Sequence, residues 1–182
     1  VGGEYLAEEL DGEGKVAILT ITAPMFQRRE DGYRDTFEKY PGIEIVTEGD
    51  TQADFPTGIS VAKSILQSNP DLDAFVCVDS VGARSAVTAI REAGRTGDVK
   101  VIGMDRNNDT VRNVGKGLVE ASVAQKGHLS TFYAMMILYN LNHNPMPITQ
   151  DNRAAGVTPA PVWVNTGVSL VTQENWRQWL RE

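Results

Sequence analysis

Short apolar segments alternate with amphipathic helical segments along most of this chain, and this alternation constrains its fold more than any other feature. Five segments have the nearly continuous apolar pattern of strands that are covered on both faces. They are residues 15–21, 43–47, 74–78, 99–104 and 118–124. Helical patterns of roughly ten to fifteen residues separate them. We therefore predict an α/β fold with a doubly wound, mostly parallel sheet and right-handed crossovers.

The chain opens at Val1, without a methionine, inside what reads as a helix already under way. This helix covers residues 1–10 and ends in the turn-rich segment 11–14. We therefore expect about half of the protein to be missing from this sequence.

Local signals mark where the later helices begin and end. A helix over residues 26–40 ends at a Pro-Gly pair, and Pro56 is expected to open the next helix at its favoured first position. Ser80 is the expected N-cap of a helix that runs to Ala93 and ends at a glycine. A polar helix is expected over residues 107–116.

The chain changes character after residue 125. Residues 127–142 are expected to form a helix whose broad apolar stripe needs a large surface to cover it. The stripe consists of Leu129, Phe132, Tyr133, Met136, Ile137 and Leu141. Residues 144–161 have the proline and glycine content of a connector. Residues 162–172 read as a strand or strand pair, and 173–181 as a closing helix.

Polar and aromatic residues stand where the predicted strands end. In doubly wound sheets ligands bind beyond the carboxyl ends of the strands, so these residues are the candidate site. They are Arg29, Phe55, Asp79, Asp105 and Gln125. Together they have the chemistry of a sugar clamp: carboxylates and an amide for hydroxyl groups, a guanidinium as a planar donor, and a ring for the apolar C–H face of a sugar.

Each of these residues also has an ordinary structural interpretation. An aspartate after a strand, such as Asp79 or Asp105, is more often a helix cap or a turn former. Phe55 alone is typical of a core residue, and Arg29 of a solvated helix face. Only the joint placement of the five at one edge indicates a site.

Composition and spacing argue against several other functions. A formal charge of −7, with 17 scattered Lys and Arg residues, argues against a nucleic-acid partner. Cys77 is the single cysteine and lies inside an apolar run, so we expect it to be buried. Residues 105–116 begin like a calcium loop but have Thr110 and Lys116 at its glycine and closing-glutamate positions. We expect no metal, cofactor or catalytic residue, and no enzyme activity.

Seven short motifs then occur in an order that resembles a known family. They are residues 2–7 (GGEYLA), 27–33 (QRREDGY), 53–55 (ADF), 69–74 (NPDLDA), 102–105 (IGMD), 121–125 (ASVAQ) and 167–172 (GVSLVT). Over essentially its whole length the chain resembles the C-terminal half of the type I periplasmic sugar-binding proteins of the ribose-binding kind. The resemblance implies a Rossmann-like lobe.

In that family two lobes close over one sugar, and the loaded protein docks on a membrane permease. The resemblance therefore implies a monosaccharide or polyol ligand, an ABC transporter permease as partner, and a periplasmic or extracytoplasmic location. It assigns ligand contacts to the same five residues. Asp79 departs from the ribose binders, which have asparagine there, so the identity of the sugar is not implied.

The resemblance also implies a division of the chain. Residues 1–125 would form the C-terminal lobe, 126–157 would belong to the missing N-terminal lobe, and 158–182 would be the return strand and closing helix. The missing lobe, or a dimer formed through helix 127–142, would cover the apolar stripe. A second function stays open, namely an effector-sensing domain of a lac-repressor-type transcription regulator or of a receptor kinase.

Overall fold

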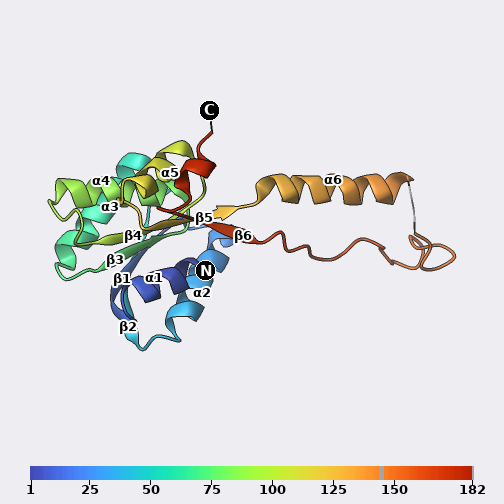
Figure 1. Ribbon diagram of the computed structural model, residues 1–182. Helices are drawn as coiled ribbons and strands as arrows, with labels where there is room; N and C mark the ends of the chain where they lie inside the picture. The colour runs from blue at the N-terminus through green and yellow to red at the C-terminus, as the bar shows by residue number, and fades with distance from the viewer. Residues whose placement is uncertain (144–145, 182) are drawn as a thin grey trace. The chain divides into compact units, whose positions relative to one another are not determined.

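The computed structural model describes residues 1–143 and 146–181, and it contains one six-stranded sheet (Figure 1). The strands are β1 (Glu13–Thr20), β2 (Gly42–Asp50), β3 (Ala74–Cys77), β4 (Lys100–Met104), β5 (Ala121–Gln125) and β6 (Val168–Thr172). Their order across the sheet is β2-β1-β3-β4-β5-β6, and β1·β2, β1·β3, β3·β4 and β4·β5 are parallel pairs. The predicted α/β class with a doubly wound, mostly parallel sheet is confirmed.

Helices cover both faces of this sheet. On one face lie α1 (Gly2–Glu9) and α2 (Pro24–Phe37), and on the other lie α3 (Phe55–Ser68), α4 (Ser80–Glu92) and α5 (Asn108–Gly115) (Figure 1). This distribution follows from right-handed crossovers, because the chain moves in opposite directions across the sheet after β1 and after β2.

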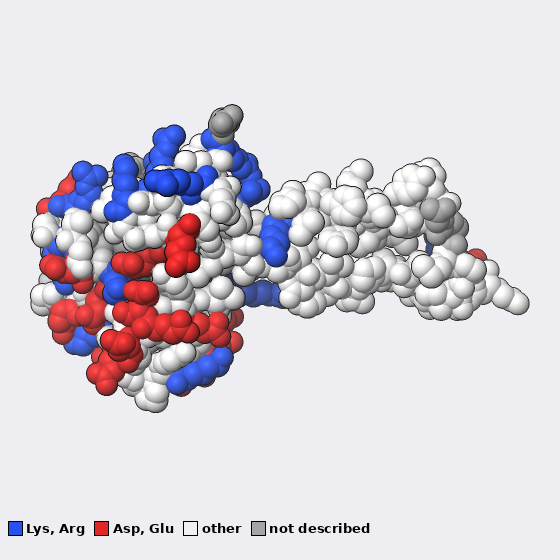
Figure 2. Space-filling model, viewed as in Figure 1, with Lys and Arg blue, Asp and Glu red and all other residues white. Residues whose placement is uncertain are grey.

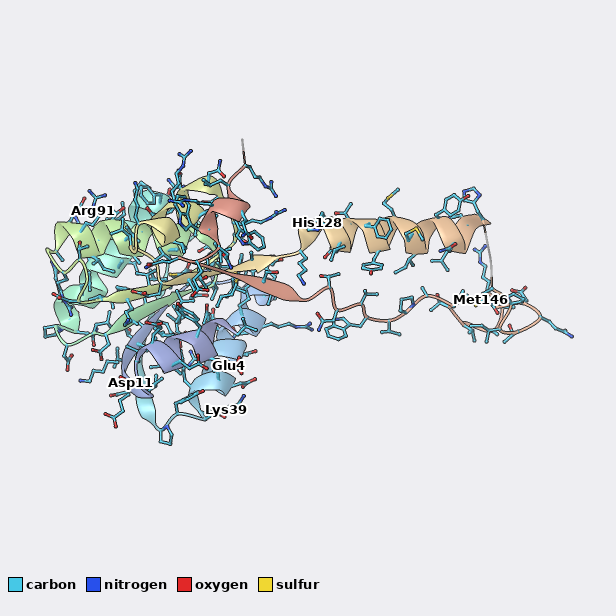
Figure 3. All side chains as sticks on the ribbon, viewed as in Figure 1. Glu4, Asp11, Lys39, Arg91, His128 and Met146 are labelled. Atoms are coloured by element: carbon cyan, nitrogen blue, oxygen red, sulfur yellow. The ribbon has the colours of Figure 1, made fainter. Side chains whose placement is uncertain are left out.

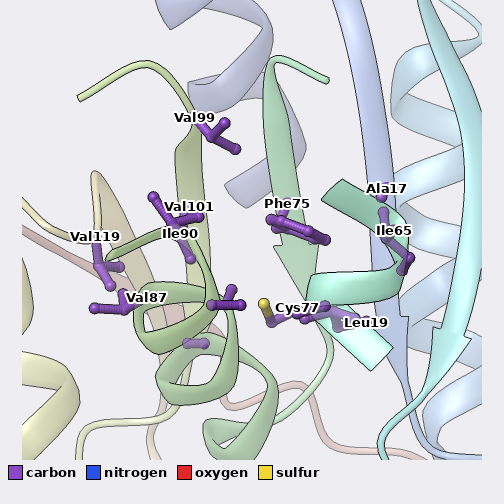
Figure 4. Packing of buried hydrophobic residues seen from close by; sticks show 14 of the residues in the cluster. Ala17, Leu19, Ile65, Phe75, Cys77, Val87, Ile90, Val99, Val101 and Val119 are labelled. Atoms are coloured by element: carbon purple, nitrogen blue, oxygen red, sulfur yellow. The ribbon is translucent and has the colours of Figure 1, made fainter. Parts of the chain in front are cut away.

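The core is built by residues that alternate along the central strands. Leu19, Phe75 and Cys77 are buried against α3 and α4 (Figure 4), whereas Val16 and Ile18 belong to a second cluster on the side of α1 and α2. Because successive side chains of a strand point to opposite faces, a strand that is apolar at every position feeds both clusters. The predicted burial of Cys77 is therefore confirmed.

The C-terminal elements are shorter than predicted. Only Val168–Thr172 is a strand, and the expected closing helix is a single 3-10 turn, η1 (Trp176–Trp179). Within the expected strand, Val162 and Trp163 are exposed, so nothing packs on them. The closing segment is held by Trp176, which packs so tightly on Gly115 that a β-carbon there would lie 2.4 Å from the indole.

The described chain divides into two compact units, Val1–Ala124 with Leu170–Glu182, and Gln125–Ser169. The second unit contains α6 (Gly127–His143), in which no residue is buried. Outside the predicted stripe, Met135, Leu138 and Tyr139 are also more than half exposed. Residues 144–145, in the predicted connector, lie outside the described residues. The assignment of residues 126–157 to a second lobe remains a prediction.

None of the described helices combines the length and the hydropathy needed to span a bilayer.

Close packing of α3 on α4 predicts opposite effects for two helical glycines. A β-carbon on Gly58 would lie 2.4 Å from the Ser85 hydroxyl oxygen, whereas nothing lies within 4 Å of one on Gly32. Gly58→Ala should therefore lower the free energy of unfolding by roughly 1–3 kcal/mol through overpacking. Gly32→Ala should raise it by about 0.5–1 kcal/mol through helix propensity. Urea unfolding of the two variants measures both, and equal midpoints would contradict the packing.

Tyr33 predicts a change in stability at high pH. Its hydroxyl is buried and has no hydrogen-bond partner among the described residues, and burial raises the pKa of the phenol well above its usual value of 10.0. Only the unfolded state then ionises just above pH 10, so stability should be full below that pH and fall as the pH rises further. Tyr33→Phe should remove the part of this fall that Tyr33 causes, leaving the part from Cys77, whose pKa burial also raises, and should stabilise the fold by about 1 kcal/mol.

The control for this prediction is Tyr40→Phe, which changes a less buried tyrosine. Urea unfolding at pH 8 and pH 10.5 compares the variants. A fall as large in Tyr33→Phe as in the wild type, with a smaller one in Tyr40→Phe, would contradict the assignment.

Candidate functional site

The candidate site lies where the strand order of the sheet reverses. β1 stands between β2 and β3, so the connections that leave β1 and β3 diverge from the carboxyl ends of these strands. The ends are joined by backbone hydrogen bonds, with Val78 N donating to Leu19 O at 3.0 Å and Thr51 N to Thr20 O at 2.8 Å. Asp79 lies just after β3, Arg29 stands on the helix that follows β1, and Phe55 opens the helix that follows β2.

Arg29 reaches this edge from α2. Its guanidinium donates a hydrogen bond to the backbone carbonyl oxygen of Val78 and lies 5.2 Å from the ring centre of Phe26. Because Val78 directly precedes Asp79, the structure brings the cation to the residue beside the predicted anion. The surface-exposed alternative for Arg29 is therefore wrong, since the side chain is partly buried and bonded.

Asp79 caps α4, so the prediction that Ser80 is the N-cap is wrong. The carboxylate of Asp79 accepts hydrogen bonds from Val81 N at 3.1 Å and Gly82 N at 2.9 Å, and the residue is only 7% exposed. Aspartate is the stronger cap here because its side chain reaches both free N–H groups of the first turn. A carboxylate has about four acceptor positions, so two remain for other donors.

Phe55 is the first residue of α3, and Asp54 is the cap of that helix. Pro56 is therefore the second residue of this helix and not the first residue, which is the position that we predicted for it. The ring of Phe55 is partly exposed, and the guanidinium carbon of Arg84 lies 4.8 Å from the ring centre. The backbone carbonyl of Phe55 accepts a hydrogen bond from the Ser85 hydroxyl at 3.4 Å. Contacts from α4 therefore fix Phe55 outside the core.

Asp105 follows β4 in a strained backbone conformation, with a φ of 72°. Its N–H donates to Val123 O at 2.9 Å, and its carbonyl accepts from the Ser122 hydroxyl at 2.7 Å, so β5 holds the strained residue in place. Among the described non-glycine residues with positive φ, Gln52 and Ala53 lie at this same edge. Strain of this kind collects at ligand sites, where the surrounding structure maintains it.

Gln125 is the last residue of β5, and its side chain is exposed. It is also the first residue of the second unit, so its place is described by the strand alone. Its predicted approach to the other four residues stays a prediction.

Several polar residues that are not among the five candidates lie at the same edge. The hydroxyl of Thr22 donates to the Asp50 carboxylate at 2.6 Å, and this bond, together with the N–H of Gln52, holds the pKa of Asp50 below its usual value. Beside them lies a depression of about 770 Å³, lined in part by Thr20 and Glu30. No spacing pattern marks these residues, because the contacts depend on how β1 and β2 pair.

Basic and acidic side chains are less evenly distributed over the surface than the scatter of Lys and Arg along the sequence suggested. On the first unit, basic side chains gather on the side of α4, α5 and the C-terminal segment, and acidic ones on the side of α1 (Figure 2). The exposed basic residues there are Arg91, Arg112, Lys116, Arg177 and Arg181. The absence of a nucleic-acid partner remains a prediction. Among the described residues, no group of three or more His, Cys, Asp or Glu side chains is placed to hold a metal ion.

The cap contacts of Asp79 predict a difference between two substitutions. Asp79→Ala should lower the free energy of unfolding by about 1 kcal/mol because two N–H groups lose their acceptor. Asp79→Asn should lower it much less, since asparagine is an equally good cap. Denaturant unfolding separates the two, with Ser80→Ala as the control. A larger loss for Ser80→Ala than for Asp79→Ala would restore Ser80 as the cap.

Comparison with known proteins identifies a family and several relatives that match most of this chain. Residues 1–144 match the family described as periplasmic binding protein domain. The chain is 30% identical over 162 residues to the D-ribose/D-allose-binding protein of Pseudomonas aeruginosa. The matched region covers 88% of this chain and 50% of that protein. It is 31% identical over 127 residues to the D-allose-binding periplasmic protein of Escherichia coli, which covers 68% of this chain and 41% of that protein.

The fold has solved counterparts. An arabinose binding protein from Geobacillus stearothermophilus superposes with a TM-score of 0.88 at 26% identity, over 98% of this chain and 61% of that chain. Of the two relatives named in the previous paragraph, the matched regions cover 50% and 41%, so this chain spans about half the length of the curated relatives that it matches.

Proposed function

This chain belongs to the periplasmic binding protein domain family, and we propose that it forms one lobe of the sugar-binding component of an ABC-type importer. The type I sugar-binding resemblance noted from the motifs agrees with this family. The observation that carries the proposal is the 30% identity over 88% of the chain to a D-ribose/D-allose-binding protein. The polar and strained carboxyl edge of the sheet supports it.

The proposed ligand is a monosaccharide or polyol held at that edge. Asp105 and the two open acceptor positions of Asp79 would accept hydrogen bonds from sugar hydroxyl groups. Arg29 would donate further hydrogen bonds from its guanidinium to the sugar. The ring of Phe55 would carry the apolar face of the sugar, and Gln125 would both donate and accept.

In the proposed function, the protein binds its ligand and catalyses no reaction of it. The relatives named above are binding proteins, and two carboxylates near an arginine are sufficient to hold hydroxyl groups. The partners that complete the function would be a second lobe, which closes over the sugar, and a membrane permease. The corresponding location is the periplasm or another extracytoplasmic space, as in the periplasmic relative from Escherichia coli.

The direct test is a ligand screen of the complete two-lobed protein. Pentoses, hexoses, inositols and amino sugars are added in a thermal-shift assay, because a ligand that binds only the folded state raises the melting temperature. We expect a shift with at least one neutral sugar. If none of these sugars produces a shift, the proposal is wrong.

Asp105 provides a test of the site within the same protein. Asp105→Asn should weaken binding of the best sugar roughly tenfold to a hundredfold, since hydrogen bonds to a charged group are worth about 1.5–3 kcal/mol. Asparagine also tolerates positive φ, so the strained backbone should be kept. The control is Asp98→Asn, an exposed residue before the amino end of the same strand. Calorimetry in which both variants bind like the wild type would remove Asp105 from the site.

A further inference from the structure

Arg84 connects Phe55 to the helices on that face of the sheet. Its guanidinium carbon lies 4.8 Å from the centre of the Phe55 ring, and its Nε lies 4.0 Å from the carboxylate of Asp109. The three residues stand on α3, α4 and α5, each of which begins at the carboxyl edge of the sheet. The sequence analysis gave Arg84 no role.

We propose that Arg84 positions the Phe55 ring for the sugar and makes the site selective for neutral over cationic ligands. This proposal rests on the proposed function. A ring has two faces, and the guanidinium covers one of them, so a ligand that stacks on Phe55 has only the other. Arg84 would act on the sugar through the ring and would not contact it.

First, the cation holds the ring, because a guanidinium over an aromatic face is attracted by the ring quadrupole. The backbone of Phe55 is held as well, by the Ser85 hydroxyl and by the Asp54 cap of α3. A ring fixed in this way loses little freedom when a sugar stacks on it.

Second, the charge of Arg84 lies close enough to act on a ligand. A ligand ammonium on the open face of the ring would be separated from the guanidinium by less than about 10 Å, roughly one Debye length at physiological ionic strength. The repulsion would therefore be only partly screened. A neutral sugar of the same shape would not experience it.

The contact with Asp109 does not account for the position of Arg84 by itself. The Nε to carboxylate distance of 4.0 Å is at the limit for an ion pair, and the two side chains are 39% and 65% exposed. Exposed pairs of this kind contribute little. The stacking on Phe55 is the closer and more specific contact.

Arg91 offers a matched control. It stands seven residues after Arg84 on α4, about two turns further on, and its side chain is exposed and projects away from the helix (Figure 3). Arg84→Met and Arg91→Met remove the same charge from the same helix, and only the first removes a contact with Phe55.

The experiment uses the complete two-lobed protein and calorimetry with the best neutral sugar of the panel. Arg84→Met should weaken binding roughly threefold to fivefold, the loss expected for a partly exposed cation–π contact, and Arg84→Lys should restore part of it. Arg91→Met should bind like the wild type. Equal affinities of Arg84→Met and Arg91→Met would overturn the positioning role.

Competition with glucosamine tests the selectivity, because a displacement assay measures even weak binding. The ratio of glucosamine affinity to neutral-sugar affinity should rise in Arg84→Met and stay unchanged in Arg91→Met. A merely structural role of Arg84 would not change this ratio. If the ratio stays the same in both variants, the selectivity part of the proposal is wrong.

A ring measurement separates this inference from the proposed function. With isotope-labelled phenylalanine, the Phe55 ring signals are assigned from the variant Phe55→Leu. They should shift in Arg84→Met and not in Arg91→Met, whether or not a sugar is present. A wild-type protein that binds no sugar would overturn the proposed function, while unmoved ring signals would overturn the contact on which this inference rests.

Discussion

The pairing of β1 with both β2 and β3 is the constraint on which the rest of this structure depends. Because β1 is central, it must be apolar on both faces, and its buried residues feed both hydrophobic clusters. The same pairing forces the chain to leave β1 and β3 in opposite directions. The segments that follow β1 and β3 diverge at this point, and polar residues such as Thr22 and Asp79 lie there.

Helix starts at this edge use the side chains that a ligand would also use. Asp54, Asp79 and Asn107 cap α3, α4 and α5, so the edge is already rich in acceptors for structural reasons. A cap role and a ligand role are therefore not alternatives for Asp79. The Asp79 carboxylate, which caps the N-terminus of α4, keeps further lone pairs. Its fixed geometry is an advantage for binding, because an anchored acceptor loses no freedom when a ligand arrives.

The sequence predicted the fold well because each strand has a strong and local pattern. Apolar runs such as 74–78 show burial on both faces, and the element order of strands and helices leaves few topologies. Predictions that depended on a single residue were weaker. Ser80 and Asp79 are both good caps, and only the geometry of the first turn decides between them. The stacking of Arg84 on Phe55 was invisible, since it depends on how α3 packs on α4.

The second unit shows that a helical sequence pattern alone does not establish which sides of a helix are buried. Outside the broad apolar stripe predicted on residues 127–142, α6 exposes further large apolar side chains, including Met135 and Leu138. A helix that is apolar all round is typical of one that is buried on most sides. That a further surface covers α6 remains a prediction.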